Sequence, residues 1–136
     1  MGRVLSVDLG KKRVGLAISD PAHIISQPFK TISFSTLPQL LCELKIIIRE
    51  KDVEDVVVGL PIKENGEEGQ GCLDARHLVK LLAGENIPAH LWDERYSSVL
   101  AENVLKSYGM KIRNNKEKVD QIAASYILEG YLQSKK

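Results

Sequence analysis

The hydrophobic positions follow two different periods along the chain, and their order predicts an α/β fold. Apolar residues that alternate or run continuously predict five strands, over 4–9, 14–19, 24–34, 55–60 and 87–93. Apolar residues at helical spacing predict four helices, over 37–51, 73–85, 99–108 and 117–132. Three strands come first, and helices and strands then alternate. This order predicts a five-stranded mixed sheet, with three antiparallel strands followed by parallel ones and with helices on both faces.

Local signals mark the ends of several elements. Pro28 interrupts the third strand, so we expect that strand at an edge of the sheet. Thr36 precedes the first helix and can cap it. Residues 63–71 are polar and contain three glycines, which predicts a loop before the second helix. No repeat or linker divides the chain, so we expect residues 1–136 to form one domain.

Length and composition fit one globular domain. The 136 residues are 43% hydrophobic and 27% charged, which excludes wholesale disorder. The sequence has no apolar run long enough for a bilayer and no signal-peptide pattern at its start, so we expect a cytoplasmic protein without a membrane partner. Cys42 and Cys72 lack metal-ligand spacing and are expected to be reduced thiols.

The charges are distributed unevenly, although the net charge is only +1. Residues 1–20 hold four bases against two acids, and residues 106–118 hold five bases against one acid. Residues 43–74, in contrast, hold nine acids and four bases. Such runs fit ordinary solvated faces, and they also fit a molecule with one basic side that binds a polyanion.

Carboxylates are the strongest candidates for chemistry. Asp8 ends the first strand, Asp93 and Glu94 end the fifth, and Asp120 lies in the first turn of the last helix. The carboxyl ends of parallel strands meet at one edge of a sheet, where ligands bind. Successive side chains of a strand point to opposite faces of the sheet, so Asp93 and Glu94 cannot both lie on the same face. Asp120 alone also fits an ordinary acid near a helix N-terminus.

Together these acids would repel one another and raise one another's pKa values, and a hard cation would remove that penalty. A set of carboxylates without Cys or His ligands favours Mg²⁺ or Mn²⁺. Two such ions can support phosphodiester cleavage. The sequence therefore predicts a divalent-cation site at the carboxyl edge of the sheet.

Other nucleotide-binding and catalytic motifs that the sequence suggests lack the residues, the chain length or the spacing that they require. The glycines at 66 and 71 have the spacing of a Walker A loop, but Cys72 and Leu73 follow where Lys and Ser or Thr are required. The Asp-x-Gly hairpin at 8–10 also opens actin-like and sugar-kinase ATPases, which need two such domains and a second phosphate loop. The chain is too short for that architecture. His23, His77 and His90 are scattered and are expected to be surface or structural residues.

Four segments, taken in order, resemble the YqgF/RuvX family of the RNase H-like superfamily, which is related to the RuvC resolvases. They are VDLGKKRVGLA at 7–17, VGLP at 58–61 with NG at 65–66, WDER at 92–95, and VDQIAA at 119–124 with IL at 127–128. The resemblance runs end to end and implies a single RNase H-like nuclease domain over residues 1–136. The family is described both as a pre-16S ribosomal RNA processing nuclease and as a Holliday junction resolvase.

The resemblance also assigns the site acids to Asp8, to Asp93 or Glu94, and to Asp120. In the RuvC relatives the second acid ends the fourth strand, where this chain has Gly59-Leu60-Pro61. The acid must then come from the next strand, about 4.8 Å further across the sheet. The longer side chain favours Glu94 as the ligand. Asp93 stays a possible ligand, or it holds Arg95 or a turn amide.

The leading hypothesis is a Mg²⁺- or Mn²⁺-dependent phosphodiesterase that acts on structured nucleic acid, with ribosomal RNA precursor as the first candidate substrate. Asp8, Glu94 and Asp120 would hold the metal and support catalysis. Basic side chains would contact backbone phosphates: Lys11, Lys12, Arg13, Arg76, Arg95, Lys111, Arg113, Lys116 and Lys118.

Two alternatives stay open. The first is the same chemistry on branched DNA, as Holliday junction resolution by a symmetric dimer. The second is a nucleic-acid-binding factor whose metal site is vestigial. The sequence shows no clear dimer face, so we expect a monomer or a weak homodimer.

Overall fold

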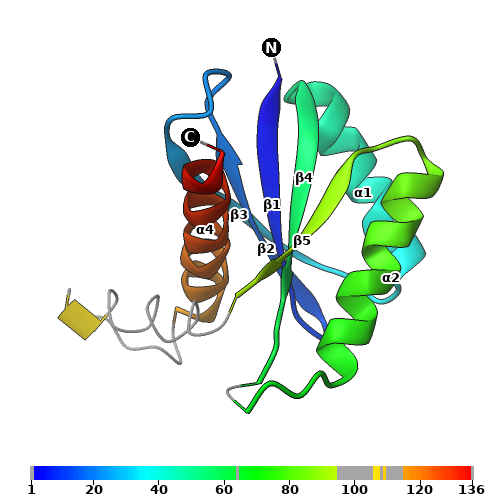
Figure 1. The fold of residues 1–136 in the computed structure, drawn as a ribbon, viewed down its shortest axis with the longest axis vertical. Helices are drawn as coiled ribbons and strands as arrows, with labels where there is room; N and C mark the ends of the chain where they lie inside the picture. The colour runs from blue at the N-terminus through cyan, green and yellow to red at the C-terminus, as the bar shows by residue number, and fades with distance from the viewer. Residues whose placement is uncertain (1, 64, 95–105, 108, 110–114, 136) are drawn as a thin grey trace.

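A mixed five-stranded sheet lies between two layers of helices in the computed structural model, which describes residues 2–63, 65–94, 106–107, 109 and 115–135 (Figure 1). Its strands are β1 (Arg3–Leu9), β2 (Arg13–Ser19), β3 (Ser26–Ser33), β4 (Val53–Leu60) and β5 (Ala89–Asp93). The order across the sheet is β3-β2-β1-β4-β5. The first three strands pair antiparallel, and β1, β4 and β5 pair parallel. This arrangement confirms the predicted sheet.

The helices divide between the two faces of the sheet. Helices α1 (Leu37–Glu50) and α2 (Gln70–Gly84) cover one face, and α4 (Lys116–Ser134) covers the other (Figure 1). Thr36 caps α1 as predicted, because its Oγ1 accepts a hydrogen bond from the Gln39 amide at 3.2 Å. Nearly all of the helix predicted over 99–108 falls outside the described residues.

Several element boundaries differ from the sequence prediction. Strand β3 begins at Ser26, because the Asp20 carboxylate accepts hydrogen bonds from the amides of Ile24 and Ile25 and holds them in a turn. Helix α2 begins at Gln70, inside the predicted loop, since Gly69 can serve as its N-cap without a side chain. Pro28 lies in the edge strand β3 as predicted, opposite a register shift between Leu16 and Ala17 of β2.

The two faces of the sheet carry different cores. The face under α1 and α2 is filled by large aliphatic side chains, among them Leu5, Leu16, Leu40, Leu44 and Leu78. The core under α4 is smaller and is built around Val4, Val57, Ile127 and Leu128. The strands therefore direct their larger side chains toward α1 and α2.

Small residues on the other face let α4 approach the sheet closely. The buried Ser6 hydroxyl donates a 2.6 Å hydrogen bond to the carbonyl of Ala124 in α4. A Cβ atom at Gly15 of β2 would overlap the carbonyl of Asp120. The absence of a side chain at Gly15 therefore fixes the first turns of α4 against β2, and with them the backbone of Asp120.

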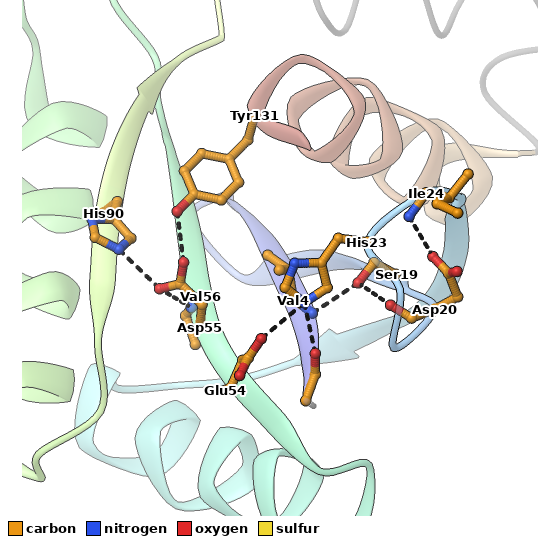
Figure 2. Close-up of polar contacts among 11 residues, drawn as sticks. Val4, Ser19, Asp20, His23, Ile24, Glu54, Asp55, Val56, His90 and Tyr131 are labelled. Carbon is orange, nitrogen blue, oxygen red and sulfur yellow. Dashed lines mark hydrogen bonds and ion pairs between the residues drawn. The ribbon is translucent and has the colours of Figure 1, made fainter. Parts of the chain in front are cut away.

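A polar network fixes the last turns of α4 at the amino edge of the parallel strands (Figure 2). The Tyr131 hydroxyl donates to Asp55 Oδ2 at 2.6 Å, and His90 Nε2 lies 2.9 Å from Asp55 Oδ1. Burial and the bond to Asp55 raise the pKa of Tyr131. His23 Nε2 lies 2.9 Å from Glu54 Oε1 in the same region. These contacts border a hollow of about 570 Å³ and tie α4 to β4 and β5.

Among the helices that the structure describes, none combines the length and apolar character needed to cross a bilayer.

We expect Gly15→Ala to lower the free energy of unfolding by about 1–3 kcal/mol, because the new methyl group forces α4 away from β2. Urea unfolding followed by circular dichroism measures this change. Gly84→Ala is the matched control, since its Cβ at the end of α2 meets no atom within 4 Å. Equal unfolding midpoints for the two variants would contradict the close packing at Gly15.

Candidate active site

Asp8 faces α4 from near the carboxyl end of β1. The antiparallel ladder pairs Asp8 with Gly15 of β2. The parallel ladder pairs Val7 with Val58, so that Gly59 of β4 follows beside Asp8. The carboxylate of Asp8 thus lies between two positions without side chains, in a partly buried setting.

Glu94 reaches Asp8 from the residue after β5, across β4. Gly59 pairs with Trp92 of β5, and a Cβ atom at Gly59 would overlap Glu94 Oε2. The Glu94 carboxylate therefore occupies the space above Gly59, close enough to Asp8 for the two carboxyl groups to shift each other's pKa. The structure brings these two predicted site acids together.

Asp93 takes the other side of the same strand. Trp92 packs with the core under α4, so alternation directs the next residue, Asp93, toward the opposite face. Its side chain is exposed, and its charge contributes to the raised pKa of Glu94. This position favours Glu94 over Asp93 as the partner of Asp8.

Both carboxyl groups of the pair hold protons more tightly than usual. Burial, followed by the charge of Asp120, raises the pKa of Asp8 to about 6. Burial, followed by the neighbouring Asp8 carboxylate, raises the pKa of Glu94 to about 9. At neutral pH Glu94 therefore holds a proton more tightly than Asp8 does.

Glu94 has one oxygen that its surroundings leave unsatisfied. Its Oε2 is buried and has no hydrogen-bond partner among the residues that the structure describes. Such an atom in a native fold calls for an explanation, because an unmade hydrogen bond of a buried polar group costs about 1–3 kcal/mol. A cation beside Asp8 and Glu94 would satisfy it.

Asp120 lies near Asp8, but its carboxylate binds the side chain of Arg13. Arg13 Nε, at the start of β2, donates to Asp120 Oδ2 at 2.7 Å. Gly10, Lys11, Lys12, Arg13 and Asp120 line a hollow of about 300 Å³. In the described part of the chain, no three His, Cys, Asp or Glu side chains already form a cluster that could hold a metal ion. The three predicted site acids are thus a neighbouring pair, Asp8 and Glu94, and Asp120, which Arg13 binds.

Apart from Arg13, which binds Asp120, the predicted phosphate-binding residues fall into three groups. Lys11, Lys12, Lys116 and Lys118 are exposed, the first two in the turn after β1 and the last two in the first turn of α4. Arg76 lies on α2 and forms two hydrogen bonds with Glu68, at 3.1 and 2.9 Å. The remaining ones, Arg95, Lys111 and Arg113, lie outside the described residues.

Sequence reasoning did not identify the glycines at 15 and 59 as parts of the site. Gly59 provides the space for the Glu94 carboxylate, and Gly15 provides the space for the backbone of Asp120. The available signal was a glycine within an apolar strand predicted to be buried, a position where glycine often marks a close approach. The ion pair between Arg13 and Asp120 had no local signal, since 107 positions separate the two residues.

Comparison with solved structures finds the same fold in two resolvases. T. thermophilus RuvC in complex with a Holliday junction substrate superposes with a TM-score of 0.59 at 14% identity, covering 99% of this chain and 96% of RuvC. Fowlpox virus resolvase in complex with Holliday junction DNA gives a TM-score of 0.56 at 15% identity, covering 97% of both chains. At these identities the likeness concerns the fold alone.

The sequence comparisons are more specific. The profile of the family described as "RuvX: Holliday junction resolvase" matches residues 2–134. A protein of Maridesulfovibrio salexigens is 42% identical over 131 residues, covering 96% of this chain and 97% of that protein. A protein of Lachnospira eligens is 39% identical over 139 residues, covering 98% of both. Both relatives carry the name "Putative pre-16S rRNA nuclease". The chain belongs to the RuvX family.

We expect the metal-free protein to lose stability as the pH rises from about 4 to about 9. The folded-state pKa values of Asp8 and Glu94 lie above their unfolded values of about 3.9 and 4.3. The folded protein therefore binds more protons in this window, and its stability falls as they are lost. Urea unfolding in a chelator at several pH values measures the slope.

Asp8→Asn should flatten this pH dependence and stabilise the metal-free protein at pH 8 by about 1–3 kcal/mol, since it removes one of two buried charges. Asp74→Asn, at an acid on α2, is the matched control and should keep the wild-type slope. The same slope in wild type and Asp8→Asn would show that the pair does not interact in this way.

Proposed function

We propose that this protein is a divalent-metal-dependent nuclease that hydrolyses phosphodiester bonds in structured RNA, with the 5′ end of pre-16S ribosomal RNA as its substrate. The observation that carries this proposal is the pairing of Asp8 with Glu94 beside Asp120, at an edge of the sheet bordered by basic residues. Membership of the RuvX family and the names of the relatives support the substrate.

The donor set fits Mg²⁺ or Mn²⁺. The three acids offer only oxygen atoms, which these hard cations prefer. Glu94 Oε2 lacks a partner among the described residues, and the raised pKa values of Asp8 and Glu94 show a cost of charge that a cation would offset. Asp8, Glu94 and Asp120 would hold the metal. When bound, the metal would supply an activated water nucleophile and stabilise the leaving oxygen.

The protein's own cations would hold the substrate. Lys11, Lys12 and Arg13 border the hollow beside Asp120, and a backbone phosphate in that hollow would lie next to the acids. Lys116 and Lys118 would extend the contact along α4. Arg95, Lys111 and Arg113, outside the described residues, are proposed from the sequence alone to contact phosphates. Arg76 would take part only after it leaves Glu68.

Cleavage of a pre-16S 5′ fragment should require Mg²⁺ or Mn²⁺ and should stop when a chelator is added. Asp8→Asn and Glu94→Gln should each lower the cleavage rate about 100-fold or more, because a lost metal ligand removes several kcal/mol of transition-state stabilisation. Denaturing gels of a 5′-labelled fragment measure the rate.

Glu85→Gln is the matched control, since Glu85 contacts Lys45 at a distance from these acids. Cleavage by Asp8→Asn at the wild-type rate would reject the proposed mechanism. Binding that survives in Asp8→Asn, without turnover by any variant in any metal, would instead indicate a non-catalytic binding factor.

A second candidate is resolution of Holliday junctions, which the description of the matching family favours. A resolvase makes two paired cuts and works as a symmetric dimer. We propose a monomer or weak homodimer, because only four large hydrophobic side chains are exposed on the described surface, Ile24, Ile25, Ile46 and Leu73. Rates on pre-16S RNA and on a four-way DNA junction, together with the mass in solution, separate the two functions. With ribosomal RNA precursor as its substrate, the protein would act in the cytoplasm.

Binding to the RNA should weaken as salt rises, and Lys11→Gln with Lys12→Gln should reduce the slope of log K against log salt by about 1 per lysine. For each lysine–phosphate contact that is lost, binding of the protein releases one fewer counterion from the RNA. Fluorescence anisotropy at several salt concentrations measures the slope. Lys51→Gln, at the end of α1, is the control and should keep the wild-type slope.

A further inference from the structure

We propose that Arg13 couples nucleic-acid binding to metal binding. In the free protein its guanidinium holds Asp120, and a backbone phosphate that enters the adjacent hollow takes over the guanidinium and frees the carboxylate for a cation. This inference rests on the proposed function, because it needs a metal and a phosphate at the same edge of the sheet.

The first step is the contact between Arg13 and Asp120. Arg13 Nε and Asp120 Oδ2 lie 2.7 Å apart, and the two side chains are 37% and 24% exposed. A pair with this exposure can open toward water while the fold stays intact. Within the described residues, it is the one ion pair that includes any of Asp8, Glu94 and Asp120. Arg13 therefore occupies an oxygen that the proposed cation would need.

The second step is the position of Arg13 between Asp120 and the hollow that could admit a phosphate. The bond to Asp120 uses one of the five N–H donors of the guanidinium. The side chain also borders the hollow of about 300 Å³ that Lys11 and Lys12 line. A guanidinium binds phosphate through two parallel hydrogen bonds, which makes phosphate a strong competitor for Asp120.

The third step is the charge balance. While Arg13 is bound, the negative charge of Asp120 is offset by a side chain of the protein. Once a phosphate takes Arg13, Asp120 stands uncompensated beside Asp8 and Glu94, and only a cation relieves the repulsion. Occupation of the hollow thus raises the affinity for metal, and by linkage metal raises the affinity for nucleic acid by the same factor. Couplings of this kind are typically about 5- to 150-fold.

The experiment measures Mn²⁺ binding by electron paramagnetic resonance at fixed ionic strength, with and without a saturating phosphorothioate RNA stem-loop. Mn²⁺ bound by the RNA alone is subtracted. We expect the RNA to tighten Mn²⁺ binding to the wild type at least about 5-fold. Arg13→Gln should bind Mn²⁺ more tightly than the wild type without RNA, and RNA should then add little. Arg13→Lys, which keeps the charge but not the two-bond geometry, should lie between them.

Arg49→Gln, on the exposed side of α1, removes the same charge elsewhere and should titrate like the wild type. A merely structural Arg13 would lower the melting temperature and leave the effect of RNA on Mn²⁺ binding unchanged. That result would overturn the proposal, as would weaker Mn²⁺ binding by free Arg13→Gln, because Arg13 would then orient Asp120 for the metal.

Failure of the coupling and failure of the proposed function give different results. If the wild type binds no Mn²⁺ with or without RNA, the metal-dependent function fails and the coupling with it. If Asp8→Asn loses Mn²⁺ binding while Arg13→Gln behaves like the wild type in both titrations, the function stands and the coupling alone is rejected.

Discussion

The site depends on two acids, Asp8 and Glu94, that the fold holds close together against their mutual repulsion. Asp8 and Glu94 would separate in water, and the fold holds them together in a partly buried position. The sheet ladders fix Asp8, and the space above Gly59 receives Glu94. The large aliphatic core under α1 and α2 lies on the other face of the sheet. The buried aliphatic side chains that stabilise the fold and the two acids that destabilise it therefore lie on opposite faces of the same sheet. Because the two acids repel each other, a cation bound between them would be stabilised by the repulsion that it removes.

Helix α4 carries the third acid, and its position depends on contacts along its whole length. Asp120 meets Arg13 near one end, the carbonyl of Ala124 accepts from Ser6 further along, and Tyr131 bonds to Asp55 about three turns after Asp120. The amino edge of the sheet thus contributes to the geometry of the carboxyl edge, although its polar network contains no proposed ligand (Figure 2).

Sequence reasoning predicted the mixed sheet, and it predicted that Asp8 and an acid after β5 lie at one edge, because both depend on local periods and on the ends of strands. The choice of Glu94 over Asp93 came from side-chain length and strand spacing, and the geometry favours the same residue. The start of β3 was wrong by two residues, since the Asp20 turn depends on a side chain that no period reveals. The contact between Arg13 and Asp120 depends on how α4 docks, which is a property of the whole fold.

The relation between Gly59 and Glu94 bears on how related proteins are compared. A side chain at position 59 and the carboxylate of Glu94 would fill the same volume, so one acid can enter that space from either of two adjacent strands. A column-by-column alignment would therefore record a missing acid in β4 and an unrelated one after β5. Related proteins are therefore better compared here by where a carboxylate oxygen lies than by which position in the sequence carries the acid.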